Sequence, residues 1–69
     1  MIYGFMVKDE FYSTEDNKTI KAGFDTKSLM TTFMMHKRIN GTLVPRPVYK
    51  SDLIVITEKN MEEFSEFFI

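Results

Sequence analysis

The side chains best suited to acid–base chemistry in this 69-residue chain are a single histidine, His36, and three pairs of adjacent carboxylates. A catalytic histidine needs an orienting partner and a nucleophile, and a working carboxylate pair needs burial that raises one pKa above the other. His36 lies at the edge of an apolar arc, next to Leu29, and the sequence indicates neither an orienting partner nor a nucleophile for it. The carboxylate pairs lie in loops or on a polar helix face, where burial is absent. We therefore expect no catalytic residue and no enzymatic activity. The carboxylate pairs are Asp9–Glu10, Glu15–Asp16 and Glu62–Glu63.

Composition also argues against cofactor and metal chemistry. The chain has no cysteine, which excludes disulfides and thiolate zinc sites, and one histidine cannot build an all-imidazole metal site. Its three glycines are not spaced as a phosphate-binding loop. We expect no cofactor and no metal, so the sequence favours a function based on binding.

Charge is strongly segregated along the chain, although the net charge is only −1. Residues 1–17 hold one lysine and four carboxylates, for a net −3, and residues 51–69 hold one lysine and five carboxylates, for a net −4. Residues 18–50 between them hold seven basic side chains and one aspartate, for a net +6. Either the three segments neutralise one another in the fold, or one charged face is left for a partner.

The acidic candidate for a binding face is the segment 57–68, which we expect to form a helix capped by Thr57. Its methionine and phenylalanines fall on one side and its glutamates on the other. Like charges four residues apart cost about 0.2 to 0.5 kcal/mol per pair in a helix. The stripe is either a solvated face or a surface that receives the basic side chains of a partner. Its members are Glu58, Glu62, Glu63 and Glu66.

A second candidate face is apolar. Asp25 or Thr26 can cap a helix that ends at Ile39, where Asn40-Gly41 supplies a left-handed stop. In such a helix Met35 and Ile39 lie outside the main apolar arc and form a second ridge. Either the helix is embedded on most of its circumference, or this ridge contacts another chain.

The basic segment suggests a further surface around Arg46, which stands between Pro45 and Pro47. Proline stiffens the chain and cannot donate to a strand ladder, so we expect residues 42–50 to be an edge strand or a connecting arm that presents Arg46. The alternative function, nucleic-acid binding by residues 18–50, conflicts with a pI of 5.7. Its candidate residues are Lys37, Arg38, Arg46 and Lys50.

The elements that must position these residues form, we expect, one α+β domain over residues 1–69. The apolar run 53–57 predicts a central strand covered on both faces, with residues 1–7 beside it and a bulge or close backbone approach at Gly4. The alternation in residues 19–24 favours a strand paired with the first; a helix from Ser13 to Ala22, closed by Gly23, is the competing interpretation.

The resulting order is strand, strand, helix, edge strand, strand, helix. It predicts a mainly antiparallel sheet of three or four strands with both helices packed on it. We expect one core to contain Ile54, Ile56, Phe64 and Phe68.

Three functions therefore compete: a protein-binding module that uses the acidic helix or the apolar ridge, a nucleic-acid binder, and a self-associating structural subunit. In its shortness, methionine content and lack of cysteine the chain is similar to small accessory proteins of large bacteriophages, which often bind, inhibit or redirect a host protein. That resemblance implies a protein partner and a cytoplasmic location, the host cytoplasm if the source is viral. No apolar run is long enough for a membrane span.

Overall fold

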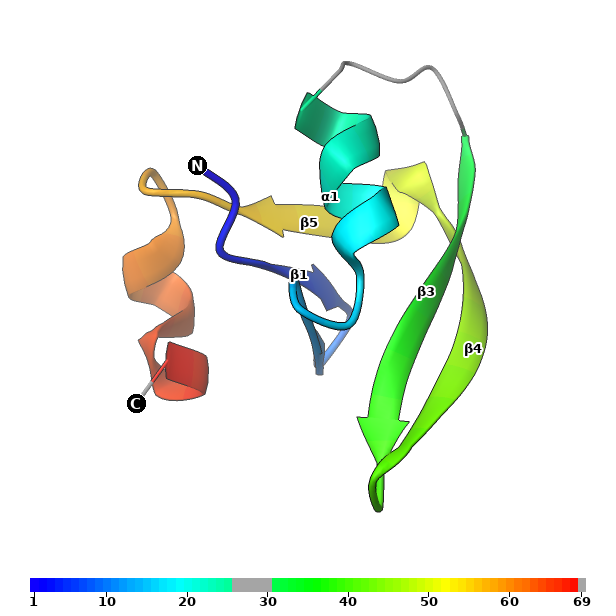
Figure 1. The fold of residues 1–69 in the computed structure, drawn as a ribbon. Coiled ribbons are helices and arrows are strands. Elements are labelled where there is room, and N and C mark those ends of the chain that lie inside the picture. Colours follow the sequence, from blue (N-terminus) through cyan, green and yellow to red (C-terminus); the bar gives the residue numbers. More distant parts are fainter. Residues whose placement is uncertain (26–30, 69) are drawn as a thin grey trace.

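The predicted α+β class is confirmed by a computed structural model, which describes residues 1–25 and 31–68 (Figure 1). The described part contains two antiparallel sheets, one α-helix and two 3-10 helices. In chain order the elements are β1 (Gly4–Val7), β2 (Glu10–Ser13), α1 (Lys18–Asp25), β3 (Thr32–Ile39), β4 (Thr42–Tyr49), η1 (Lys50–Asp52), β5 (Leu53–Ile56) and η2 (Met61–Phe68).

The first sheet has the strand order β2-β1-β5, so the N-terminal strand β1 is its centre. Phe5 of β1 lies opposite Tyr12 of β2 and Val55 of β5, and all strands are antiparallel. The run 53–57 does form a strand, but our prediction that this strand is central and covered on both faces is wrong. It pairs with β1 on one side only, and Ile54 is 45% exposed.

The second sheet is the hairpin of β3 and β4, where we had predicted a helix followed by an edge strand. The edge strand is confirmed, whereas the helix is wrong over residues 32–39. Asn40 and Gly41 both have positive φ, 51° and 81°, which suits the two-residue turn of a hairpin as well as a helix stop. Of the two expected caps, Asp25 ends α1 instead, and Thr26 lies outside the described residues.

The helix α1 occupies the segment for which we had predicted a strand, residues 19–24. Ile20 and Phe24 alternate with polar residues, but they are also four apart, which places them on one face of a helix. Both pack on the core. The competing helical interpretation was therefore closer, although Gly23 does not end the helix.

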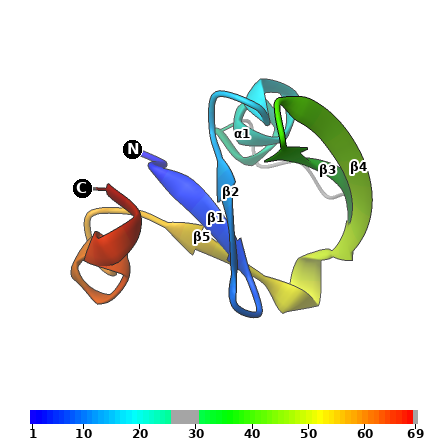
Figure 2. The ribbon, with the colours of Figure 1, turned by 90° about the horizontal axis from the view of Figure 1, so that it is seen from below.

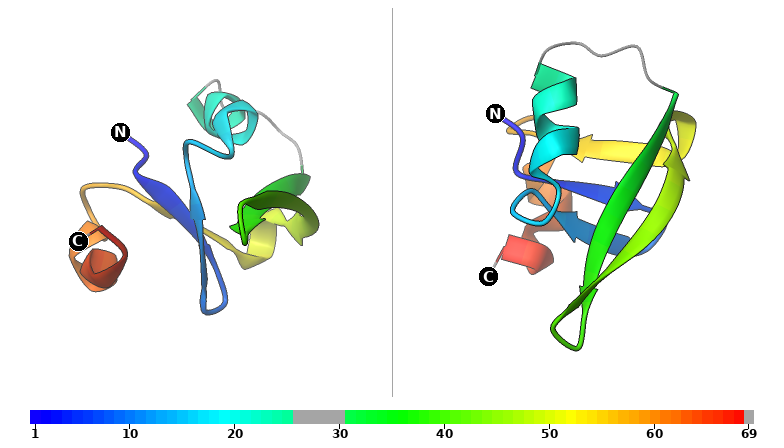
Figure 3. Two further views of the ribbon diagram at one scale, coloured as in Figure 1. Left: turned by 60° about the horizontal axis from the view of Figure 1, so that its bottom comes forward. Right: turned by 45° about the vertical axis from the view of Figure 1, so that its right-hand side comes forward.

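The main core lies between the three-stranded sheet and a layer made of α1 and the hairpin (Figure 2). Alternate strand residues point into it, as the two-residue period of a strand requires. Figure 3 shows η2 on the other side of the three-stranded sheet. The buried residues of this core are Phe5, Tyr12, Phe33, Met35 and Val48.

A smaller aromatic cluster attaches η2 to its side of the sheet. The ring of Phe11 stacks on Phe67, with centroids 5.3 Å apart, and meets Phe68 edge-on at 5.4 Å. A Cβ on Gly4 would lie 2.5 Å from Cε1 of Phe11. Gly4 therefore has a close neighbour, but that neighbour is the side-chain ring of Phe11. The register of β1 shows no bulge at this position.

The C-terminal helix differs from its prediction in its start and in its type. It begins at Met61, is a 3-10 helix and is interrupted at Phe64, whose φ and ψ are −118° and 23°. Thr57 lies in the preceding turn, where its backbone carbonyl accepts from the N–H of Met61. The predicted shared core is wrong for the exposed Ile54; Ile56 is fully buried, and Phe64 and Phe68 are half-buried.

Candidate functional site

Two of the predicted basic binding residues are held in ion pairs with the acidic N-terminal segment. Arg46 donates from Nη1 to both carboxylate oxygens of Glu10, at 3.0 and 2.8 Å. Arg38 donates from Nη2 to Oδ1 of Asp16 at 2.9 Å, and this hydrogen bond lowers the pKa of Asp16. The +6 segment and the −3 segment thus neutralise each other at these positions.

Lys37 is also directed inward. Its Nζ donates to the backbone carbonyl of Phe11 at 2.9 Å and lies 5.2 Å from the ring centroid of Tyr12. Tyr12 is buried and donates its hydroxyl to Glu10, and burial is the main cause that raises the pKa of Tyr12. Of the four basic residues assigned to nucleic-acid binding, only Lys50 is exposed and without an ion-pair or side-chain hydrogen-bond partner in the described residues.

The acidic residues of η2 are in the opposite situation. Glu62, Glu63 and Glu66 are exposed, and none has an ion-pair partner among residues 1–25 and 31–68. Glu58 does not belong with them, because it lies in the turn before η2 and pairs with the amino group of Met1 at 2.8 Å. This contact lowers the pKa of Glu58. The predicted spacing of four is also broken by the interruption at Phe64.

The predicted apolar ridge of Met35 and Ile39 does not exist as a surface. Met35 points inward from β3 and is fully buried, so it has nothing to offer a partner. Ile39 is 37% exposed at the tip of the hairpin. In a strand these two residues share the inward face, so the burial of Met35 follows from the change from helix to strand.

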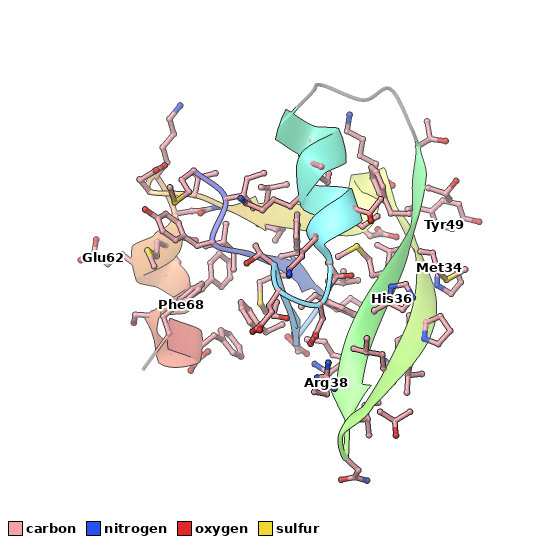
Figure 4. All side chains as sticks on the ribbon, viewed as in Figure 1. Met34, His36, Arg38, Tyr49, Glu62 and Phe68 are labelled. Atoms are coloured by element: carbon pink, nitrogen blue, oxygen red, sulfur yellow. The ribbon has the colours of Figure 1, made fainter. Side chains whose placement is uncertain are left out.

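The sequence prediction missed the apolar surface that does exist, on the side of the hairpin turned away from the core (Figure 4). Met34, Leu43 and Tyr49 are 51%, 42% and 65% exposed. The two-residue alternation within residues 42–49 could have indicated this surface, because it places Leu43, Pro45, Pro47 and Tyr49 on one side of a strand. We call this surface the outer hairpin face, and it consists of Met34, Leu43, Pro45, Pro47 and Tyr49, with the half-buried His36 among them.

His36 makes its hydrogen bonds through its backbone. Its N–H donates to Oδ1 of Asn17 at 2.7 Å, and its carbonyl accepts from Nδ2 of the same residue at 2.9 Å. In the described part of the chain the imidazole has no hydrogen-bond partner, and no three His, Cys, Asp or Glu residues lie together as metal ligands. The geometry around His36 therefore gives it no orienting group for catalysis.

The outer edges of both sheets are blocked, and two asparagines do much of this. Asn17 is 2% exposed and bonds to the free edge of β3 at His36 and to the edge of β2 at Ser13, whose carbonyl accepts at 2.8 Å. Asn60 does the same for β5: it accepts from the N–H of Thr57 at 2.8 Å and donates to the carbonyl of Val55 at 3.1 Å.

Proline blocks the remaining edge. Pro45 and Pro47 lie opposite His36 and Met34, at positions whose N–H groups would otherwise point away from the hairpin. Edge strands without free donors resist pairing with another strand. A partner must therefore contact side-chain faces of this molecule, since strand addition is blocked at these positions.

The chain matches no protein-family model, no curated protein sequence and no solved structure. Among the described residues, no helix has the length and apolar character needed to cross a bilayer. The surfaces themselves therefore carry the functional argument.

Proposed function

We propose that this chain is a small, non-enzymatic protein-binding module whose acidic C-terminal end binds a basic surface of another protein. We define the acidic end as η2 with its three unpaired glutamates, Glu62, Glu63 and Glu66, together with the exposed apolar residues Ile54 and Phe67. By occupying a functional surface of the partner, such a module would inhibit or redirect it.

The observation that carries the proposal is the uneven fate of the charges. In the acidic N-terminal segment, Glu10 and Asp16 form surface ion pairs with Arg46 and Arg38 of the same chain. The negative charge of η2 has no such counterpart among the described residues and stands at one end of a molecule 30 Å across (Figure 4). A field concentrated in this way accelerates encounter with a surface of opposite sign.

Apolar side chains in η2 and on the same face of the sheet support a contact surface over a merely solvated helix. Ile54 is 45% exposed although it points to the side of the sheet on which η2 packs, and Phe67 is exposed beside the glutamates in sequence. Exposed apolar groups rimmed by charge are typical of protein-binding sites.

The competing nucleic-acid function loses most of its support from the same contacts. Three of its four residues, Lys37, Arg38 and Arg46, donate to groups of the chain itself. Each phosphate neutralised on binding requires a cation that is free to release counterions. We expect no affinity for nucleic acid tighter than about micromolar at physiological salt.

Affinity capture from a lysate of the source organism, with mass spectrometry of the bound proteins and a nuclease-treated duplicate, tests the proposal. The E62Q/E66Q variant is compared with D9N, which neutralises an exposed carboxylate outside both the acidic end and the outer hairpin face. We expect a basic protein that is retained by the parent and by D9N and lost from E62Q/E66Q. Equal loss from both variants, or loss of all bound material after nuclease treatment, would contradict the proposal.

A further inference from the structure

The outer hairpin face, on the side of the molecule opposite the acidic end, takes no part in the function above. We propose that it binds a second copy of this chain, in a dimer with two-fold symmetry. The shape of this face, the charges at its two ends and the blocked strand edges all favour such a dimer.

The face carries a protrusion and a groove. Tyr49 protrudes with 65% of its surface exposed. A groove of about 520 Å³ runs beside α1 and is floored by Ile20, Met34, His36 and Leu43. Leu43, at the far end of the groove, is six residues from Tyr49 along β4, or about 20 Å at 3.3 Å per residue.

A protrusion and a groove that lie apart on one face are self-complementary. A two-fold axis that lies in the plane of the face and runs across the strands places the protrusion of each copy over the groove of the other, which is the isologous arrangement of most dimers. The axis then passes near Pro45 and Pro47, between Leu43 and Tyr49 on the same strand. The flat, apolar proline surfaces allow the two hairpins to approach closely there.

The charges at the two ends of the face follow the same symmetry. Lys50 comes directly after Tyr49, and Asp52 follows it; Glu15 and Lys18 line the rim of the groove. All four are exposed, and none has an ion-pair partner among the described residues. The two-fold arrangement brings Lys50 toward Glu15 of the other copy. It also brings Asp52 toward Lys18 of the other copy, so that both pairs have opposite charges.

The mode of contact follows from the strand edges. Because Asn17, Asn60 and the two prolines block edge pairing, the copies meet through side chains. The two-fold arrangement uses the same face of both copies, so the association closes at two. One face of an 8.2 kDa chain is small, and small interfaces are weak, so we expect a dissociation constant of about 100 µM. The acidic ends then point outward, which gives the dimer two identical partner-binding ends.

Sedimentation velocity over a concentration series, at low salt, measures the association. We expect Tyr49→Ser to weaken dimerisation by about tenfold or more, because the ring would be buried in the groove of the other copy and the two-fold axis repeats this contact. The matched control is Ile39→Thr, on the same hairpin but in the inward row, which should change the affinity by less than about threefold. Circular dichroism melts confirm that both variants fold.

A charge exchange provides a test that is independent of Tyr49. K50E and E15K should each weaken self-association several-fold, because each places like charges opposite one another. Mixing them in equal amounts should restore dimers, because both cross pairs then have opposite charges.

A parent that stays monomeric up to about 1 mM, where a 100 µM dimer would prevail, would overturn the proposal. Equal dimerisation by Tyr49→Ser, assembly beyond the dimer, or a mixture of K50E and E15K that associates no better than its components would do so too. E62Q/E66Q should dimerise like the parent, so that failure of the acidic end and failure of the dimer are distinguished.

Discussion

Asn17 is the residue whose loss should most clearly separate the two sheets. Its side chain donates to the carbonyls of Ser13 and His36, at 2.8 and 2.9 Å, and accepts from the N–H of His36 at 2.7 Å. It therefore joins the edge of β2 to the edge of β3 while the backbone of Asn17 starts α1. No other described side chain bonds to two strand edges in this way.

The cost of Asn17→Ala follows from these contacts. Each hydrogen bond contributes about 1 kcal/mol net, and a buried backbone group left unpaired costs about 1 to 3 kcal/mol. With three bonds lost at a site 2% exposed, we expect a loss of about 3 to 5 kcal/mol. A 69-residue domain has a total stability of roughly 3 to 10 kcal/mol, so this single change removes a large part of it.

Urea denaturation followed by circular dichroism measures that loss, with two controls. Asn60→Ala removes two bonds at a half-buried site and should cost about 1 to 2 kcal/mol. Asn17→Asp keeps the acceptor for His36 but sets a carboxylate against two carbonyls, which raises its folded pKa; its stability should therefore increase as the pH falls. An Asn17→Ala variant within 1 kcal/mol of the parent, or no less stable than Asn60→Ala, would refute the reasoning.

Three further predictions concern stability, pH and strand edges. Gly4→Ala places a Cβ 2.5 Å from an aromatic ring atom and should cost about 1 to 3 kcal/mol, measured by thermal unfolding; an unchanged melting temperature would show that the ring moves freely. Arg38 lowers the pKa of Asp16, so this pair stabilises the fold above the unfolded pKa of about 4 and the contribution is lost as the pH falls through the folded pKa. R38Q should shift the Asp16 titration seen by NMR back upward, and an unmoved titration would rule out the pair. Pro45→Val with Pro47→Val restores two edge donors and should increase concentration-dependent aggregation seen by light scattering, whereas a variant as soluble as the parent would contradict the edge-blocking role.

Some elements could be predicted from the sequence because their local residue pattern favours the same structure that they adopt in the fold. The strand at residues 4–7, the strand at 53–56 and the proline-rich edge strand each have one consistent pattern. The segment 32–39, in contrast, has no single consistent pattern. Its apolar residues fit both a helical and a two-residue period, and Asn40-Gly41 is both a helix stop and a hairpin turn. Pairing with β4 decides between the helix and the strand, and this pairing cannot be read from the local sequence of residues 32–39.

Some features of the candidate surfaces can likewise be predicted from the sequence, and others depend on the fold. Unpaired glutamates at the C-terminal end are visible in the sequence, because nothing basic lies near them in the chain except Lys59. The pairing of Arg46 with Glu10, 36 residues away, and the role of Asn17 depend on how the strands are placed. The outer hairpin face was hidden for a simpler reason, since the wrong period assigns Met34 and Met35 to the wrong sides.

The most direct test of the central claim is the rate at which the captured partner associates with the parent and with E62Q/E66Q, measured by stopped-flow at several salt concentrations. If the acidic end is the binding face, the parent associates faster at low salt, its rate falls as salt is added, and the difference between the two proteins disappears at high salt. Because both glutamates are exposed and unpaired in the described residues, the variant should be at least as stable as the parent. Equal association rates at low salt would remove the acidic end from the binding site.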